Sequence, residues 1–299
     1  MNGIIPHAII DSEVRILEDL IMKDTIRESL SYWSLYGKML RVKKEVKPRV
    51  IPFGSHKHQY FLYYEPENLV SDKVILWVHG GGWNAGTPRM FDFVGQCVAK
   101  NGYRFISIGY RLSPKYKYPC QIEDVCAGYK ASIEFLTANG IDTNKIIVSG
   151  PSAGAHLSAI LCYSKGTQEE NGIDISNVIG FIGVGGPYLF SGRQSLSVSL
   201  LLNQLFDKGY DRTLGEPYSL LAESHIPMLL IQSRHDGLIE YSCAEHFYEK
   251  AKKLGIECEL YTVADQKNTH SWYTAGMFLE TREENQSLNQ FFSWIEKIG

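Results

Sequence analysis

Residues 146–157 read IIVSGPSAGAHL, an apolar run followed by Gly-x-Ser-x-Gly and then by apolar residues with helical spacing. This order predicts a buried strand that turns sharply into a helix, with Ser152 at the turn. The glycines that flank Ser152 are small enough for the backbone to bend back on itself. A serine hydroxyl is a weak nucleophile until it is held exposed beside a base, and such a turn exposes it. Ser152 is therefore the candidate nucleophile.

On both sides of this segment the chain alternates between strand-like and helix-like patterns. Short apolar runs predict strands, and apolar residues three and four positions apart predict helices. We expect strands at 49–53, 60–64, 73–78, 104–109, 145–149, 178–184, 228–232 and 257–263, and helices at 89–101, 121–139, 153–164, 242–254 and 283–298. The alternation predicts an α/β fold with one mostly parallel, doubly wound sheet, helices on both faces and a small helical cap.

The chain has no Pro/Gly/Ser-rich linker, which favours one α/β domain over residues 46–299. Residues 1–45 are expected to form a helical arm or cap, because apolar positions between 12 and 44 recur at helical steps. A variable segment at about 187–220 is expected to add a cap-like insertion to the domain.

The base and the residue that orients it are expected after the nucleophile, in the order acid and then histidine. Asp236 follows the strand at 228–232, and His270 follows the strand at 257–263. Loops at one edge of a parallel sheet can converge, so Ser152, Asp236 and His270 form a candidate triad. His270 is preferred because no other histidine lies after the last strand. The alternatives by residue type are His156, His225, His235 and His246 for the base and Asp265 for the acid.

A second motif, HGGGW at residues 79–83, follows another expected strand. Consecutive glycines let a loop approach a substrate closely and direct successive amides toward one oxygen. Together with the Ala153 amide at the start of a helix, the Gly81 and Gly82 amides are the candidate oxyanion hole. His79 is interpreted as a structural residue of this loop.

Composition limits the remaining possibilities. The 299 residues carry a net charge of −3 and no concentrated basic run, which argues against a nucleic-acid partner. Cys, His and carboxylate residues are not clustered at metal-ligand spacing, so we expect no metal and no cofactor. We see no signal-peptide pattern and no apolar run near the ~18–20 residues of a bilayer span. The six scattered cysteines are interpreted as reduced thiols of a cytoplasmic protein.

In combination, the motifs resemble the esterase/lipase branch of the α/β-hydrolases. The resemblance rests on HGGGW, on YRLSP at 110–114, on EDV at 123–125 and on the segment 150–157, and it spans about residues 70–275. It implies an α/β-hydrolase fold, with 110–114 and Asp124 as structural supports near the floor of the site. The branch includes carboxylesterases, acetyl esterases and kynurenine formamidases. The chain departs from the pattern at 1–45 and 187–220, where such enzymes shape the substrate pocket.

We therefore expect a serine hydrolase that cleaves carboxylic esters of small acyl groups through an acyl-enzyme intermediate. An alternative is an arylformamidase that acts on N-formyl amides, for which Trp83, Tyr188 and Trp272 would line a pocket for a flat aryl group. Trp83 could equally be a packing residue. A non-catalytic ligand receptor on the same fold is disfavoured by the presence of His270. The expected partner is a small-molecule ester or amide, and a homo-oligomer is left open.

Overall fold

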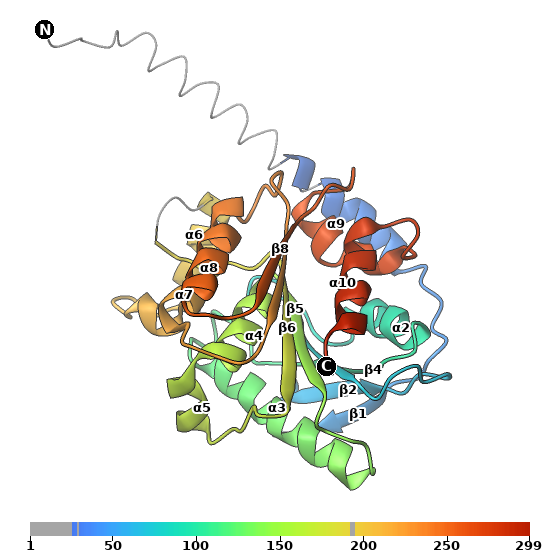
Figure 1. The fold of residues 1–299 in the computed structure, drawn as a ribbon. Coiled ribbons are helices and arrows are strands. Elements are labelled where there is room, and N and C mark those ends of the chain that lie inside the picture. The colour runs from blue at the N-terminus through green and yellow to red at the C-terminus, as the bar shows by residue number, and fades with distance from the viewer. Residues whose placement is uncertain (1–25, 29, 192–194) are drawn as a thin grey trace, which may run out of the picture.

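An eight-stranded sheet runs through the centre of the protein (Figure 1). The computed structural model describes residues 26–28, 30–191 and 195–299. The strands lie in the order β1-β2-β4-β3-β5-β6-β7-β8; β1 and β2 are antiparallel to their neighbours, and all other pairs are parallel. Their bounds are β1 Arg49–Pro52, β2 Tyr60–Tyr64, β3 Val74–Val78, β4 Arg104–Ile108, β5 Ile146–Pro151, β6 Val178–Val184, β7 Met228–Gln232 and β8 Cys258–Thr262.

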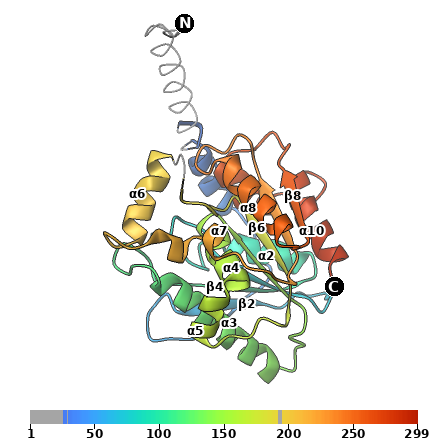
Figure 2. The same ribbon diagram turned by 60° about the vertical axis from the view of Figure 1, so that its left-hand side comes forward.

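Helices cover both faces of this sheet (Figures 1 and 2). The α-helices are α2 Asp92–Lys100, α3 Cys120–Ala138, α4 Ala153–Tyr163, α5 Lys165–Asn171, α6 Leu196–Leu205, α7 Pro217–Leu220, α8 Tyr241–Lys253, α9 His270–Thr274 and α10 Gln286–Lys297. Two short 3₁₀ helices are η1 Arg212–Gly215 and η2 Gly276–Leu279. Residues 26–28 and 30–39 are also helical, and we call them the arm helix.

Alternation along the strands builds two cores. In β3, Val74, Leu76 and Val78 enter the core that α3, α4 and α8 cover, whereas Ile75 and Trp77 enter the core on the side of α2 and α10. A strand that is buried on both faces reads as a continuous apolar run, which is why the sequence predicted these strands. The predicted mostly parallel, doubly wound sheet with flanking helices is confirmed.

Several expected elements differ from those observed. The helix expected up to residue 44 ends at 39, and its part before residue 26 lies outside the described residues. A turn follows it at 40–41, and the Gln96 side chain accepts hydrogen bonds from the amides of Glu45 and Val46. Helix α5 was not expected. The segment at 187–220 contains α6, η1 and α7, with residues 192–194 outside the described part.

The carboxyl ends of β5, β7 and β8 open at the same end of the sheet because these strands are parallel. The arm helix and α6 lie at this end as well (Figures 1 and 2). None of the helices in the described ranges has both the length and the apolar character that crossing a bilayer requires.

Candidate active site

Ser152 occupies the turn between β5 and α4, with φ 52° and ψ −123°. This conformation is unfavourable for a residue with a side chain and is typical of functional sites. The turn leaves no space at Gly154, where a Cβ atom would lie 2.0 Å from the Val78 carbonyl oxygen. A Cβ atom at Gly150 would lie 2.6 Å from the carbonyl carbon of Gly154. Glycine on both sides of Ser152 is therefore a packing requirement of the turn.

Asp236 and His270 are joined by a 2.7 Å hydrogen bond between Oδ2 and Nδ1. The Asp236 side chain is fully buried, and its Oδ1 accepts hydrogen bonds from the amides of Leu238 and Ile239 at 2.8 and 2.9 Å. Oδ2 also accepts one from the Tyr273 hydroxyl. A carboxylate can only accept, so Nδ1 of His270 carries the hydrogen and Nε2 is the nitrogen that can take up a proton.

The protonation of His270 is set by two opposed effects. Burial lowers the pKa of the imidazole, but the charge of Asp236 and its hydrogen bond outweigh burial, so the pKa lies above its ordinary value. His270 was expected on a loop and is instead the first residue of α9. The helix begins there because the Thr269 carbonyl accepts hydrogen bonds from the amides of Trp272 and Tyr273. Five residues are too few for a helical pattern to be recognised in the sequence.

The glycine loop lies beside Ser152. Gly81 and Gly82 have φ values of 113° and 56°, which favour glycine. Within the described residues their amides donate to no other group, whereas the Gly81 carbonyl accepts from the amides of Asn84 and Ala85. Gly81, Gly82 and Ala153 all line the same cavity. An oxygen that develops negative charge in this cavity could accept hydrogen bonds from these amides.

This cavity has a volume of about 390 Å³, and both Ser152 and His270 line it. Its walls are mostly apolar and come from the arm helix, the glycine loop, α6 and the loop after Asp236. The apolar side chains in the walls include Tyr32, Leu35, Tyr36, Met39, Met90, Phe91, Val198, Leu201, Leu238 and Ile239. Such a pocket suits an uncharged molecule whose polar group lies at one end.

The three aromatic residues proposed for substrate binding have different positions. Trp83 lines the cavity, and its Nε1 donates to Nδ1 of His156 at 3.2 Å. Tyr188 and Trp272 are not among the described residues that line it. Tyr188 is buried under α8, where its ring stacks on Phe247 at 4.6 Å. Trp272 is two positions after His270 on α9 and is therefore rotated by about 200° from it. The expectation for these two residues needs correction.

The other candidate histidines have structural roles or lie elsewhere. His79 and His156 are fully buried, and burial lowers the pKa of each to about 4, so both are neutral at pH 7. Nε2 of His156 donates to the Gly215 carbonyl at 2.7 Å, and the His79 ring stacks on Tyr110. The described residues that line the cavity do not include His225, His235 or His246.

The alternative acid and the expected structural carboxylate also have clear partners. Asp265 accepts hydrogen bonds from the amides of Gln286 and Ser287 at the start of α10, at 3.1 Å each. Asp124 is buried and forms 2.8 Å hydrogen bonds with the Arg111 guanidinium. Both carboxylates therefore hold segments of the fold together.

The sequence patterns predicted an arm or cap here but did not reveal that it contacts the segment around His270. Leu35 lines the cavity, and Glu28 and Ser31 are buried behind His270. Glu28, Ser31 and Leu35 are three and then four positions apart, a spacing that is typical of one side of a helix. This spacing is the signal in the sequence that could have grouped them. A Glu and a Ser at such positions would ordinarily be interpreted as exposed residues.

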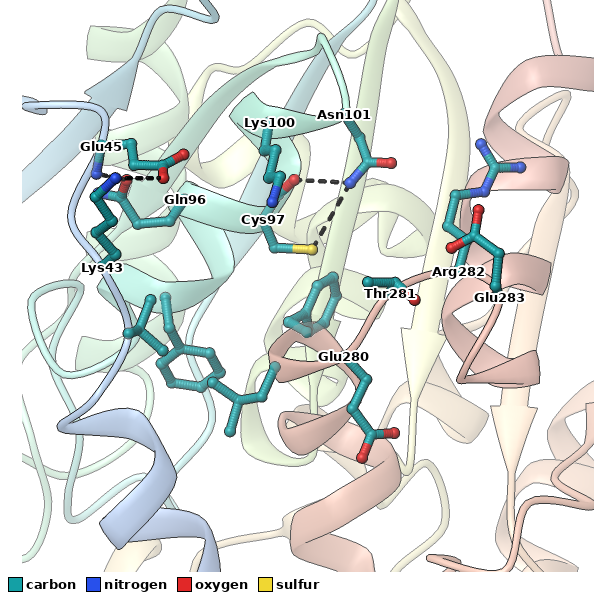
Figure 3. A pocket seen from close by; sticks show the side chains of 14 residues that line it. Lys43, Glu45, Gln96, Cys97, Lys100, Asn101, Glu280, Thr281, Arg282 and Glu283 are labelled. Atoms are coloured by element: carbon teal, nitrogen blue, oxygen red, sulfur yellow. Dashed lines mark hydrogen bonds and ion pairs between the residues drawn. The ribbon is translucent and has the colours of Figure 1, made fainter.

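A second cavity, of about 420 Å³, lies between α2, η2 and the segment that follows the arm helix (Figure 3). Several of its polar groups are bonded to protein partners. Gln96 accepts from the Glu45 amide, the Asn101 side chain donates to the Cys97 carbonyl at 2.9 Å, and Arg282 pairs with Glu296. Burial raises the pKa of the Cys97 thiol to about 12, so it is not a reactive thiolate.

Comparison with protein families and curated proteins points to esterases. The BD-FAE family model matches residues 62–251, a range that includes Ser152 and Asp236 and ends before His270. An ethyl acetate hydrolase from Pseudomonas putida is 30% identical over 112 residues, which cover 36% of this chain and 35% of that protein. Esterase LipC from Mycobacterium tuberculosis is 26% identical over 236 residues, 72% of this chain and 57% of LipC. The chain thus spans less than two thirds of either relative.

Solved structures show the same fold. The Francisella virulence factor BioJ superimposes with a TM-score of 0.71 at 22% identity, covering 95% of both chains. EstE1, a thermophilic carboxylesterase cloned from a metagenomic library, superimposes with a TM-score of 0.70 at 19% identity, covering 91% of this chain and 96% of EstE1. The α/β-hydrolase fold that the motifs implied is confirmed.

Proposed function

The chain belongs to the BD-FAE family, and on that premise we propose that it is a serine esterase that hydrolyses carboxylic esters of small acyl groups. The observation that carries the proposal is the cavity that Ser152 and His270 share, with His270 held by Asp236 at 2.7 Å. The relatives named esterase and ethyl acetate hydrolase support the same activity.

In the proposed reaction, Oγ of Ser152 attacks the ester carbonyl carbon while Nε2 of His270 takes the hydroxyl proton. The amides of Gly81, Gly82 and Ala153 stabilise the resulting oxyanion. His270 then gives its proton to the leaving alkoxide, the alcohol departs, and Ser152 carries the acyl group. A water molecule attacks this acyl-enzyme while His270 takes its proton. The returned proton restores the Ser152 hydroxyl as the carboxylic acid leaves.

The apolar walls favour an uncharged ester over a charged one, because a buried charge needs a partner that these walls do not supply. The formamidase alternative is weaker for two reasons. Tyr188 and Trp272, two of the three aromatic residues that suggested it, are not among the described residues that line the cavity, and the relatives reported above are named as ester hydrolases.

We also propose a cytoplasmic location, which rests on the scattered cysteines; no disulfide joins any two cysteines in the described part of the chain. The division into an arm at 1–45 and a domain at 46–299 stays a prediction, and a homo-oligomer is left open.

Hydrolysis of p-nitrophenyl acetate and labelling by a fluorophosphonate probe test the proposal. We expect Ser152→Ala to abolish labelling and to lower kcat on the order of a millionfold, because the nucleophile is removed. Ser242→Ala, on α8, is the control and should retain both. Wild-type hydrolysis in Ser152→Ala would overturn the nucleophile assignment, and faster turnover of N-formylkynurenine than of the ester would favour the formamidase.

A further inference from the structure

Glu28 of the arm helix is bonded to the two segments that carry His270 and Asp236. Its carboxyl group is buried, with 2% of the residue exposed. Oε1 accepts a 2.9 Å hydrogen bond from the His270 amide and a 3.1 Å hydrogen bond from the Gly237 amide. Gly237 directly follows Asp236, so one oxygen atom ties the backbone of the proposed base to the backbone next to the proposed acid.

Ser31, one turn further along the arm helix, bonds on both sides of His270. Its Oγ lies 2.6 Å from Oγ1 of Thr269 and 2.7 Å from Oγ of Ser271. Both contacts are buried. The residues on either side of His270 and its own amide are thus all held by one face of the arm helix, which lies beside α9 in Figure 1.

The carboxyl group also acts on the charge of the site. Burial raises the pKa of Glu28 above its ordinary value, although the two amides and His270 oppose this. Glu28 in turn contributes to the raised pKa of His270, after the larger effects of burial and Asp236. The titratable groups that interact with Glu28 are His270, Asp236 and Tyr32, and Tyr273 reaches the same site through Asp236.

Packing alone does not explain a carboxyl group at this buried position. Burying a carboxyl group destabilises the folded protein unless hydrogen bonds compensate. Oε2 of Glu28 has no hydrogen-bond partner among the described residues. An apolar side chain could hold the helix against α9, but it could not accept hydrogen bonds from the amides of Gly237 and His270.

We infer that Glu28 is a positioning residue for His270 and Asp236, so that the buried face of the arm helix supports these two residues as well as lining the cavity. The inference rests on the proposed function. Reaction rates fall steeply when a catalytic group moves by an ångström, and Glu28 and Ser31 restrict that movement.

The test compares Glu28→Ala, Glu28→Gln and Ser31→Ala with wild type, using p-nitrophenyl acetate over a range of pH. We expect Glu28→Ala to lower kcat about 10- to 100-fold with little change in KM, because His270 loses its hold while the cavity keeps its shape. Glu28→Gln retains an oxygen that can accept both amides, so kcat should change little. The acidic side of its pH–activity profile should move to lower pH, because the negative charge that raises the pKa of His270 is gone.

Two matched controls separate positioning from general effects. Ser34→Ala changes an exposed serine on the same helix, and Glu45→Gln removes the same charge from an exposed site; both should behave as wild type. Thermal unfolding of each variant shows whether it is folded. If Glu28→Ala fails to fold, Glu28→Gln and Ser31→Ala carry the test.

A folded Glu28→Ala variant with wild-type kcat would overturn this inference alone. The same holds if Glu28→Gln shows an unshifted pH–activity profile and Ser31→Ala has wild-type kcat. Absence of Ser152-dependent fluorophosphonate labelling in the wild-type protein would overturn the proposed function together with it.

Discussion

The two cavities have similar volumes, about 390 and 420 Å³, but differ in the state of their polar groups. Around the larger one, Gln96 and Asn101 are bonded to nearby protein groups (Figure 3). The smaller one has a serine in a left-handed conformation and, within the described ranges, two glycine amides that donate to no protein group. Unused hydrogen-bonding capacity and an unfavourable backbone conformation, rather than volume, therefore distinguish the candidate site.

Asp236→Asn, beside the smaller cavity, should have the largest effect of the substitutions that test this comparison. We expect kcat/KM to fall on the order of 10⁴-fold, because an amide no longer holds the imidazole in the required tautomer. His270 must be neutral to accept a proton, so wild-type activity should decline as pH falls through a value above the ordinary pKa of 6.5. Without the carboxylate this pKa falls, and the acid limb should move to lower pH.

Asp265→Asn is the matched control for that experiment. Asp265 accepts hydrogen bonds at the start of α10, so its replacement should affect stability more than kcat/KM. A loss of activity in Asp265→Asn equal to that in Asp236→Asn would reopen the choice between the two acids.

Substitutions in the glycine loop should have the second largest effect, and the effect should differ between Gly81 and Gly82. A Cβ atom at Gly81 would lie 2.3 Å from the Ala85 carbonyl oxygen, whereas one at Gly82 would lie 2.9 Å from the tip of Leu201, which can move. We expect Gly81→Ala to lower kcat about 100-fold by displacing oxyanion donors. Gly82→Ala should lower kcat less, about tenfold, because Leu201 can move and the oxyanion donors are displaced less.

Gly140→Ala is the control for the glycine variants. Gly140 also has a left-handed φ, of 69°, but no atom lies within 4 Å of its Cβ position. It should keep wild-type kcat, and melting curves should show only a small loss of stability. Equal kcat in Gly81→Ala and Gly140→Ala would contradict the oxyanion assignment.

The smallest effect is expected at the second cavity. Cys97→Ser and Lys100→Ala should leave kcat/KM within about twofold of wild type, as is usual for substitutions away from a functional feature. Cys97 should also react slowly with a maleimide at pH 7, because its pKa is about 12. A large loss of esterase activity in either variant would mean that the two cavities are coupled.

The sequence predicted those parts of the fold and site whose signals are local. The β3 strand is an unbroken apolar run because both of its faces are buried. Ser152 stands out because its turn excludes side chains at Gly150 and Gly154. These requirements act over a few residues, so they leave a pattern that can be recognised without a structure.

The parts of the site that the sequence did not predict depend on side-chain orientation and on contacts between residues far apart in the chain. Tyr188 has the residue type of a pocket wall, but only the structure shows that its ring faces Phe247. Glu28 bonds to residues 209 and 242 positions away, a relation that no local pattern contains. The esterase expectation depended on combined motifs, and the BD-FAE match is consistent with it.

The topology has a consequence for the nascent chain. The three proposed catalytic side chains come from positions 152, 236 and 270, and the last of these becomes available only after the preceding strands have been translated. Because domains tend to fold as units during synthesis, Ser152 and His270 should come together only after the whole domain has left the ribosome. The ribosome-bound protein would then remain inert toward cellular esters until residue 270 has emerged and docked.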